Sequence, residues 1–430
     1  MKIAFKTLGC RVNLYETDAL ASRFKAAGYE IVDADEDTDV FVVNTCTVTN
    51  QSDQKCRQAL HQIRRQHPGS LIVATGCMVN HRKNELLENK TVDYAIDNER
   101  KYALFNIIDK HFKGEQVDPE GLDVDLFGYQ PAFDTFHTRS LIKIHDGCNN
   151  FCSYCLIPMV RGRATSRSDK DIYDNIRSVV DHGFKEIVLT GVNMGRYQYQ
   201  DVNFEGLVEN ILNIDGDFRL RISSIEPDNF SDRFLRLFEN EKLAPHMHIC
   251  LQSGAENTLK SMRRHYTAAE FKNMCERIKT AIPYFNITTD MIVGFPGETE
   301  EDFLESAELC REIGFSHIHT FKYSVRNGTK AATMPNQIPE KIKTERSAVI
   351  RNISSENKKR YFEQMIGKQQ KMLIERISSD GIAQGYGENY IPMRLKGKHL
   401  EKNTFVDVIV DGIIGKGDKA EVRVIQTDTF

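Results

Sequence analysis

Three cysteines on one short stretch, Cys148, Cys152 and Cys155, constrain this chain more than any other feature of its sequence. Thiolates are soft ligands that select zinc, copper(I) or iron–sulfur clusters. A closed structural zinc site takes four protein ligands, whereas this stretch supplies three. It fits either a 4Fe–4S cluster with one iron open to a small molecule or a zinc knuckle completed by a distant ligand. The spacing of three and then two residues favours the cluster, with Tyr154 as an aromatic shield against water.

The first 113 residues alternate between strand-like and helix-like patterns. Apolar strands are expected at residues 3–7, 40–44 and 71–75, and helices at residues 14–27 and 52–66. Such alternation indicates βαβ units and an open parallel sheet.

Three further cysteines, Cys10, Cys46 and Cys77, each follow one of these strands by one to three residues. Because the carboxyl ends of parallel strands share one edge of a sheet, we expect the three thiols to converge. They would then form a second three-cysteine cluster with one open iron. The alternative is that they are small buried apolar side chains, as free cysteines often are. Cys56 lies nearly three helical turns beyond Cys46 and is interpreted as a non-ligand.

From residue 140 the alternation resumes on a larger scale. Six strands are expected at residues 141–145, 186–190, 218–223, 247–251, 287–293 and 317–322, and helices at residues 169–182, 204–213, 231–240, 256–280 and 300–313. Six βα units indicate a partial (β/α)6 barrel, whose chemistry lies at the C-terminal ends of its strands. The stretch with Cys148, Cys152 and Cys155 follows the first strand and therefore falls at that face.

The tail changes to short strands after a helical pattern at residues 340–363. Five strands are expected at residues 370–377, 381–386, 389–395, 405–410 and 420–425. They indicate a small antiparallel β-barrel, and partly open five-stranded barrels often bind oligonucleotides. Tyr386, Tyr390 and Phe405 could stack on bases or belong to the core of this barrel.

Several motifs together resemble those of the radical S-adenosylmethionine (SAM) methylthiotransferases. The stretch from Cys148 to Cys155, with an aromatic residue before its third cysteine, resembles the radical SAM signature. The wider resemblance rests on LGCRVNLYET at 8–17, VNTCTVT at 43–49, TGC at 75–77, RGR at 161–163, LQSG at 251–254 and GFPGET at 294–299. Residues 7–17 and 190–195 look most like the class that modifies threonylcarbamoyladenosine in tRNA. The resemblance covers essentially the whole chain.

The resemblance implies two 4Fe–4S clusters and a SAM site. The catalytic cluster, which would bind SAM, would be held by Cys148, Cys152 and Cys155. An auxiliary cluster would be held by Cys10, Cys46 and Cys77. Candidate SAM contacts, most of them on loops that follow barrel strands, are Tyr154, Asn193, Ser224, Glu226 and Gln252.

The resemblance also implies the reaction. Electron transfer to SAM would give a 5′-deoxyadenosyl radical, and a methylthio group would be added to carbon 2 of threonylcarbamoyladenosine next to the anticodon, with a second SAM as methyl donor. The negative threonyl carboxylate would need a cationic partner, for which Arg163 and Arg264 are candidates. Alternatives are methylthiolation of isopentenyladenosine in tRNA, methylthiolation of a ribosomal-protein aspartate, and a non-enzymatic zinc-thiolate RNA-binding protein.

Length and the resemblance together suggest the domain organisation. At 430 residues the chain should hold two or three domains. We expect a methylthiotransferase N-terminal domain at residues 1–113, a linker at 114–138, a radical SAM core at 139–364 and a TRAM-like RNA-binding barrel at 367–430.

Charge and hydrophobicity bear on partners and location. The net charge of -4 gives no global sign of nucleic-acid binding, so the tRNA anticodon stem-loop would meet local basic patches. Arg161, Arg163 and Arg167 could bind RNA phosphate, order the active site or form a solvated loop. No run approaches the roughly 18 apolar residues of a membrane span, and the start reads as a strand rather than a signal peptide. We expect a cytoplasmic monomer that uses a low-potential electron donor.

Overall fold

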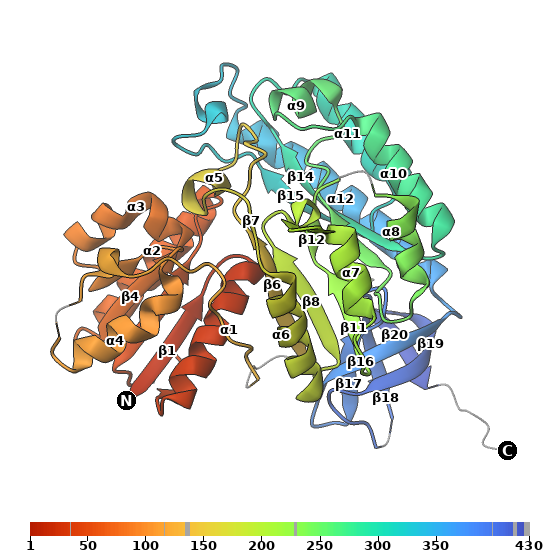
Figure 1. The fold of residues 1–430 in the computed structure, drawn as a ribbon. Coiled ribbons are helices and arrows are strands. Elements are labelled where there is room, and N and C mark those ends of the chain that lie inside the picture. The colour runs from red at the N-terminus through yellow and green to blue at the C-terminus, as the bar shows by residue number, and fades with distance from the viewer. Residues whose placement is uncertain are drawn as a thin grey trace.

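The computed structural model describes residues 1–34, 36–115, 117–133, 138–227, 230–397, 399–415 and 419–424. Figure 1 shows three parts in chain order: an N-terminal α/β unit, a central half-barrel of strands flanked by helices, and a small C-terminal β-barrel. The predicted fold class is confirmed. Within these residues, no helix combines the length and the apolar character that crossing a membrane requires.

The N-terminal unit is an open sheet of five parallel strands in the order β2-β1-β3-β4-β5. The strands are β1 (Lys2–Thr7), β2 (Glu30–Ile31), β3 (Val40–Thr45), β4 (Leu71–Gly76) and β5 (Tyr94–Ile96), and the helices are α1 (Arg11–Ala26), α2 (Asn50–Gln66), α3 (Cys77–Glu88) and α4 (Leu104–Phe112). The sequence did not reveal β2, β5, α3 or α4. Strands of two and three residues are too short to show a periodicity. Strands β3 and β4 are buried along their whole length, which explains their continuous apolar runs.

The central part contains the six predicted strands. They are β6 (Arg139–Asp146), β8 (Glu186–Gly191), β11 (Arg219–Ile222), β13 (His246–Ile249), β14 (Asn286–Val293) and β15 (His317–Lys322). They form two four-stranded sheets, each with one short added strand, β7 (Thr165–Ser166) or β12 (Ser224–Ile225). A parallel bridge between Leu220 and Leu243 joins the sheets, so the strands follow one another in chain order around a half-barrel.

The helices of the central part surround the half-barrel. They are α5 (Ile157–Val160), α6 (Asp169–Asp181), α7 (Phe204–Leu212), α8 (Asp232–Arg236), α9 (Glu256–Ser261), α10 (Ala268–Ala281), α11 (Glu300–Ile313) and α12 (Glu340–Gln364). The single helix predicted over 256–280 is wrong, because Arg263 adopts a left-handed backbone with φ of 59° and ends the first segment. Thr267 and Glu270 then form a capping box that starts α10.

The last helix of the central part covers an open sheet edge. Helix α12 packs on β15, where the Ser354 hydroxyl accepts a 2.9 Å hydrogen bond from the backbone of Ile318. Ile350 and Ile353 of α12 are buried in the main core. The helical pattern predicted at residues 340–363 is therefore present, and one face of this helix is committed to packing.

The tail is a closed barrel in the order β16-β17-β18-β20-β19. Its strands are β16 (Gln369–Ile377), β17 (Ile382–Tyr386), β18 (Pro392–Lys396), β19 (Phe405–Ile414) and β20 (Lys419–Val424). Four pairings are antiparallel as predicted. The fifth, between β18 and β20, is parallel and closes the barrel. Ile425, at the end of the last predicted strand, lies outside the described residues.

The C-terminal barrel is fixed to the N-terminal ends of the central strands. Asn286, at the start of β14, donates a 2.7 Å hydrogen bond to the carbonyl of Asn389. Arg219, at the start of β11, donates a 2.9 Å bond to the carbonyl of Lys371. Figure 1 shows the blue barrel at the end of the half-barrel opposite α5. The barrel therefore lies across the core from the loop that carries Cys148, Cys152 and Cys155.

Tyr386, Tyr390 and Phe405 contribute to this docking. The rings of Tyr386 and Tyr390 stack with centroids 4.7 Å apart, and the guanidinium of Arg139 lies over both rings. Arg219 lies over the ring of Phe405 at 5.3 Å. All three aromatic residues are half-buried against arginines of the core, so the structure favours a packing role over base stacking.

Candidate active site

The first cysteine triad lies on a loop between β6 and α5. Gly147 precedes it with φ of 67°, and a Cβ there would lie 2.0 Å from the carbonyl oxygen of Arg163. Only glycine lets the loop turn back on itself so tightly. Cys148 then donates its backbone N–H to Gly162 at 3.2 Å, and Ser153 donates to the carbonyl of Met262 at 3.0 Å. These bonds fix the backbone that presents the three half-buried thiols.

Polar side chains donate hydrogen bonds to the sulfurs of this triad. The Asn193 amide is 3.6 Å from Cys148 Sγ, and Arg264 Nη1 is 3.3 Å from Cys152 Sγ. Burial raises the pKa of the Cys155 thiol to about 12. Buried thiols of this kind ionise when a bound metal compensates their charge, so metal binding would release protons. The donors around the sulfurs would stabilise the resulting thiolates.

The second triad lies at the carboxyl edge of the N-terminal sheet. Cys10 is the residue before α1, Cys46 follows β3 and Cys77 starts α3. Because β1, β3 and β4 are adjacent, the structure brings the three thiols to one cavity of about 780 Å³. Burial raises the pKa of Cys46 to about 12, and the charges of Cys77 and Cys10 act in the same direction. The expected convergence of these three cysteines is therefore present.

Local backbone geometry allows this convergence. Gly9 has φ of 110°, and a Cβ there would lie 2.7 Å from the Cβ of Cys46. Gly76 has φ of 97°, and its Cβ would lie 2.4 Å from the carbonyl of Thr45. Side chains at either position would separate the loops, so both glycines are required for the close approach.

The remaining cysteines do not join either triad. Cys56 is fully buried, donates to the carbonyl of Cys46 and accepts from its backbone N–H, both at 3.3 Å. Cys275 and Cys310 belong to the main hydrophobic core. Cys250 lies beside His248 and Asp290, in a separate polar cluster.

The candidate SAM contacts lie around the first triad, in two neighbouring cavities. Tyr154 and Gln252 line a cavity of about 180 Å³ together with Cys155. Ser224 lines the cavity of about 780 Å³ that also receives the second triad. Glu226 forms an ion pair with Arg264, and the Asn193 amide lies 3.6 Å from Cys148 Sγ. The structure thus brings all five near the first triad or the adjoining cavity.

A buried ionic network joins the N-terminal unit to the core. Glu16 on α1 pairs with Arg161 at 3.1 Å, with Lys143 at 2.8 Å and with Lys101. Although burial alone would raise it, these three cations hold the pKa of Glu16 well below its ordinary value. Arg161 also pairs with Asp146 at 2.9 Å. The network fixes the two cysteine triads relative to one another.

This network decides among the interpretations of the arginines after the cysteine loop. Arg161 is 3% exposed and Arg167 is 5% exposed, so neither belongs to a solvated loop. Arg161 orders the active site. Arg163 is exposed, and its guanidinium lies 4.5 Å from the ring centroid of Phe151. Of the three, Arg163 alone remains accessible to an RNA backbone.

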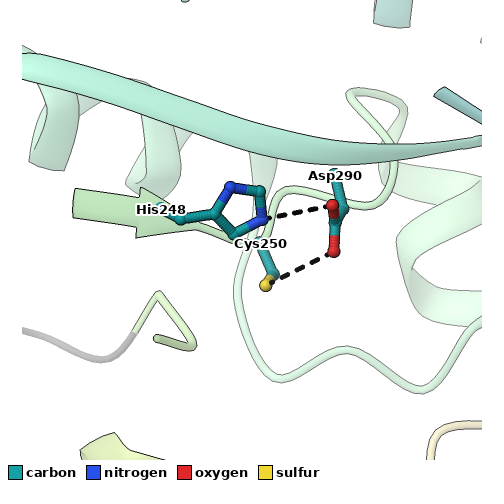
Figure 2. A group of neighbouring side chains, drawn as sticks. All are labelled: His248, Cys250 and Asp290. Carbon is teal, nitrogen blue, oxygen red and sulfur yellow. Dashed lines mark hydrogen bonds and ion pairs between the residues drawn. The ribbon is translucent and has the colours of Figure 1, made fainter. Parts of the chain in front are cut away.

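Sequence reasoning missed a polar cluster inside the half-barrel. Figure 2 shows His248, Cys250 and Asp290, with the His248 Nε2 3.1 Å from the carboxylate of Asp290 and the Cys250 thiol directed at the same carboxylate. His248 and Cys250 are two residues apart at the end of one strand, and Asp290 is on the neighbouring strand. The alternation of His246, His248 and Cys250 in the sequence was the available signal, because residues two apart on a strand share a face.

The spacing of the cysteines tests which metal group they could hold. Within the described residues, one group of three possible metal ligands has its donor atoms within 4.8 Å of one another, namely His248, Cys250 and Asp290. The sulfur atoms of neither cysteine triad lie this close together. Sulfurs around a single tetrahedral zinc ion would be about 3.8 Å apart. The triads therefore fit a larger cluster better than a single ion.

Unpaired polar atoms beside both triads also fit a bound group. The side-chain oxygens of Asn193 and Asn98 are buried without a hydrogen-bond partner within the described residues. Asn193 contacts Cys148, and the Asn98 amide lies 3.6 Å from Cys77 Sγ. Buried polar atoms are normally paired, so these positions suit ligands or ordered water.

Comparison with known proteins bears on this site. Residues 2–97 match the uncharacterized protein family UPF0004, and residues 142–310 match the radical SAM superfamily. The threonylcarbamoyladenosine tRNA methylthiotransferase MtaB of Bacillus subtilis is 38% identical over 414 residues, which cover 92% of this chain and 90% of that protein. The MtaB protein of Aquifex aeolicus is 35% identical, with 95% and 100% covered. The tRNA-2-methylthio-N(6)-dimethylallyladenosine synthase of Pelotomaculum thermopropionicum is 34% identical, with 89% and 88% covered.

A solved structure shares the fold. The radical S-adenosylmethionine methyltransferase TsrM from Kitasatospora setae aligns with a TM-score of 0.57 over 77% of each chain, at 14% identity. The half-barrel, its cysteine loop and the matched superfamily define a radical SAM protein. Within that superfamily, the chain belongs to the methylthiotransferase family.

Proposed function

We propose that this protein adds a methylthio group to carbon 2 of threonylcarbamoyladenosine in tRNA by radical SAM chemistry. The proposal draws on the names of the MtaB relatives, which match most of this chain at 33% to 38% identity. The structural observation that carries it is the cavity of about 780 Å³, which reaches from the second cysteine triad to the loops beside the first. A cavity of this size can hold a nucleoside.

We propose that each triad holds one 4Fe–4S cluster. Cys148, Cys152 and Cys155 would hold the cluster that binds SAM, and the auxiliary cluster would be held by Cys10, Cys46 and Cys77. A reduced cluster with SAM supplies the low-potential electron that radical chemistry at an unactivated carbon requires. Three protein ligands for a four-iron cluster leave one iron open at each site, which suits a SAM ligand at one and a sulfur donor at the other.

The residues of this chain would position and shield the reacting groups. Arg264 donates to the Cys152 sulfur and pairs with Glu226, so it orients both a cluster ligand and a candidate SAM contact. Tyr154 is inserted against Phe295, with ring centroids 6.4 Å apart, and together with the buried Leu156 it would exclude water. Gln252 has a left-handed backbone with φ of 66°, and its backbone N–H donates a 2.9 Å hydrogen bond to the backbone carbonyl of Asp290.

An anticodon-loop nucleotide suits a site of this kind. The base has to leave its stack to reach a cavity inside the protein, and an unpaired loop nucleotide can do so at lower cost than a base in a duplex. This supports the nucleoside next to the anticodon as the target and the anticodon stem-loop as the partner.

Nucleoside mass spectrometry of tRNA tests the proposed substrate. A strain lacking this gene should lose 2-methylthio-threonylcarbamoyladenosine and accumulate its precursor without the methylthio group, and methylthio-isopentenyladenosine should persist. Loss of the isopentenyl species instead would support the alternative suggested by the dimethylallyladenosine synthase relatives. No change in either would leave the ribosomal-protein aspartate as the target.

Metal analysis tests the number of clusters. Anaerobically reconstituted protein should hold close to twice the iron of a variant in which Cys10, Cys46 and Cys77 are all changed to alanine. Equal iron in the two proteins would contradict a second cluster. Stoichiometric zinc and a colourless protein would support the zinc-thiolate alternative.

The domains would divide these tasks. We propose that residues 1–113 carry the auxiliary cluster, 139–364 the SAM chemistry and 367–430 the RNA-binding barrel, joined by a linker at 114–138. Residues 116 and 134–137 of that linker, and 398, 416–418 and 425–430 of the tail, lie outside the described residues. A cytoplasmic monomer that receives electrons from a low-potential protein donor would suffice for this reaction, and sedimentation of the reconstituted protein would test the monomer.

A further inference from the structure

One arginine in the central cavity has no partner. Arg11, the first residue of α1, is half-buried and lines the cavity of about 780 Å³. Across the described residues it makes no hydrogen bond, ion pair or ring contact. Arg161, which lines the same cavity, is instead saturated by Glu16, Asp146 and Asn13. A half-buried guanidinium without a counter-charge is costly unless a ligand supplies one.

The wall around Arg11 offers few carboxylates. His246, His248 and His319 line the same cavity, and so does Tyr390 from the C-terminal barrel. Burial lowers the pKa of His319, and the charges of His248 and Arg11 lower it further. Arg11 lines the same cavity as His246 and Tyr390, and its charge contributes to the lowered pKa of both.

The single carboxylate in this wall is already engaged. Among the described residues that line the cavity, Asp290 is the one acid, and it pairs with His248 at 3.1 Å. In addition, the Nδ1 atom of His246 is buried without a hydrogen-bond partner within the described residues. The Arg11 guanidinium and an unpaired imidazole nitrogen therefore face a cavity whose one described carboxylate is already paired.

We infer that Arg11 binds the carboxylate of the threonylcarbamoyl group of the substrate, an inference that rests on the proposed function. Carbon 2 and the N6 substituent belong to the same ring of adenine. A base whose carbon 2 faces the triad of Cys10, Cys46 and Cys77 therefore keeps its N6 substituent inside the same cavity. Arg11, the residue after Cys10, lines that cavity. The planar guanidinium can bind a carboxylate through two parallel hydrogen bonds. His246, His248 and His319 would surround the rest of the substituent.

The two arginines suggested by the sequence are less suited to this role. The side chain of Arg264 is 3% exposed and already pairs with Glu226, Cys152 and Tyr266. Arg163 is exposed and stacks on Phe151. Neither of them lines the cavity of about 780 Å³.

RNA binding to reconstituted, unreduced protein tests the inference. The probes are two anticodon stem-loops, one with threonylcarbamoyladenosine and one with its carboxylate converted to the neutral carboxamide. Wild type should bind the acid more tightly by about tenfold to a hundredfold, the range expected for a hydrogen bond between charged groups. Arg11→Gln should bind the acid as weakly as the carboxamide and leave carboxamide binding unchanged. Arg11→Lys, which keeps the charge, should recover part of the preference.

A matched control removes a nearby charge outside the cavity. Arg376 is exposed and, like Arg11, lines the adjoining cavity of about 470 Å³ beside the C-terminal barrel. Arg376→Gln should keep the wild-type ratio of acid to carboxamide affinity. Thermal unfolding of each variant would show that it is folded, and KM for the acid RNA should rise in Arg11→Gln more than kcat falls.

Three results would overturn the inference. If Arg11→Gln keeps the wild-type ratio of acid to carboxamide affinity, a contact between Arg11 and the carboxylate is excluded. If Arg11→Gln keeps this ratio but binds SAM more weakly than wild type does, Arg11 contacts the carboxylate of SAM instead. Wild type that forms product but binds both RNAs equally would contradict this inference alone, whereas wild type that forms no product on either RNA would contradict the proposed function.

Discussion

Arg161 donates a 2.6 Å hydrogen bond to the side-chain oxygen of Asn13. The donor follows the loop of the first cysteine triad, and the acceptor lies three residues after Cys10 of the second. Asn13 in turn donates to the carbonyl of Thr45 at 3.0 Å, next to Cys46. One buried chain of bonds therefore sets the position of both triads.

Replacing Arg161 should destabilise the protein and separate the two sites. Arg161→Met leaves Glu16 and Asp146 with less positive charge in a buried setting, and breaking such a pair costs about 3–5 kcal/mol. Chemical denaturation would measure this loss. Arg163→Met, at an exposed position two residues away, should change the free energy of unfolding by less than about 1 kcal/mol. A double-mutant cycle with Asn13→Ala should show coupling, and additive effects would contradict the link.

The two triads should fail in different ways when mutated. Cys152→Ser should stop the release of 5′-deoxyadenosine from SAM, because the SAM-binding cluster loses a ligand. Cys46→Ser should retain some release and give no methylthio product. Chromatography of nucleosides and of SAM products separates these outcomes. Full product from Cys46→Ser would remove Cys46 from the auxiliary site.

Cys56 provides the matched control for Cys46. Its thiol bonds to the backbone of Cys46 in both directions, and a serine hydroxyl can keep these bonds. Cys56→Ser should therefore retain wild-type iron and product. Loss of iron in this variant would show that Cys56 is a ligand.

Much of the fold could be predicted because buried strands appear in the sequence as continuous apolar runs. The apolar runs before Cys46 and Cys77 located β3 and β4, and the position of parallel strand ends placed the thiols on one edge. The docking of the C-terminal barrel could not be predicted. Arg139, Arg219 and Arg221 look like surface residues in the sequence, and only the fold reveals that they share one buried carboxylate.

The site was predictable where residues act locally and unpredictable where they act across domains. The three cysteines of the first loop are neighbours in sequence. Arg161 meets Glu16 across 145 positions, so nothing local distinguished it from a solvated arginine. The missing counter-charge of Arg11 likewise depends on which side chains surround it in three dimensions.

Glu186 should be a main determinant of how the barrel is docked. Its carboxylate is fully buried and pairs with Arg219 at 2.7 Å, with Arg221 at 3.1 Å and with Arg139 at 3.3 Å. Glu186→Gln should lower the free energy of unfolding by about 3–5 kcal/mol, because it leaves buried arginines without compensation. Glu375→Gln, a half-buried partner of Arg139, should cost about 1 kcal/mol.

The effect of Glu186→Gln should depend on pH. Although burial alone would raise it, the arginines hold the pKa of Glu186 far below its ordinary value. The stabilisation is therefore fully present above pH ~4.3, the unfolded value, and is lost as the pH falls toward the folded pKa. Denaturation at several pH values should show the difference from wild type shrinking below about pH 4. A constant difference would mean that charge is not the cause.

Asp18 should give the opposite pH dependence. It is half-buried on α1, and burial raises its pKa to about 7. The folded state then binds a proton more readily than the unfolded state, so stability falls as the pH rises from about 4 to about 7. Asp18→Asn should be more stable than wild type by about 1–2 kcal/mol at pH 8, because partial exposure screens part of the shift. It should match wild type near pH 4, and equal stability at pH 8 would contradict the raised pKa.

The barrel surface should bind RNA through a groove on its exposed side. Arg394 and Lys419 line a groove of about 580 Å³ there, away from the aromatic residues that dock the barrel. Changing both to alanine should weaken tRNA binding and reduce the slope of log affinity against log salt by about 1.5, because two phosphate contacts are lost. Release of 5′-deoxyadenosine should be unchanged. Lys170→Ala with Arg177→Ala, on exposed positions of α6, removes the same charge elsewhere and should leave the slope as in wild type. A groove variant with wild-type affinity and slope would assign the barrel to packing alone.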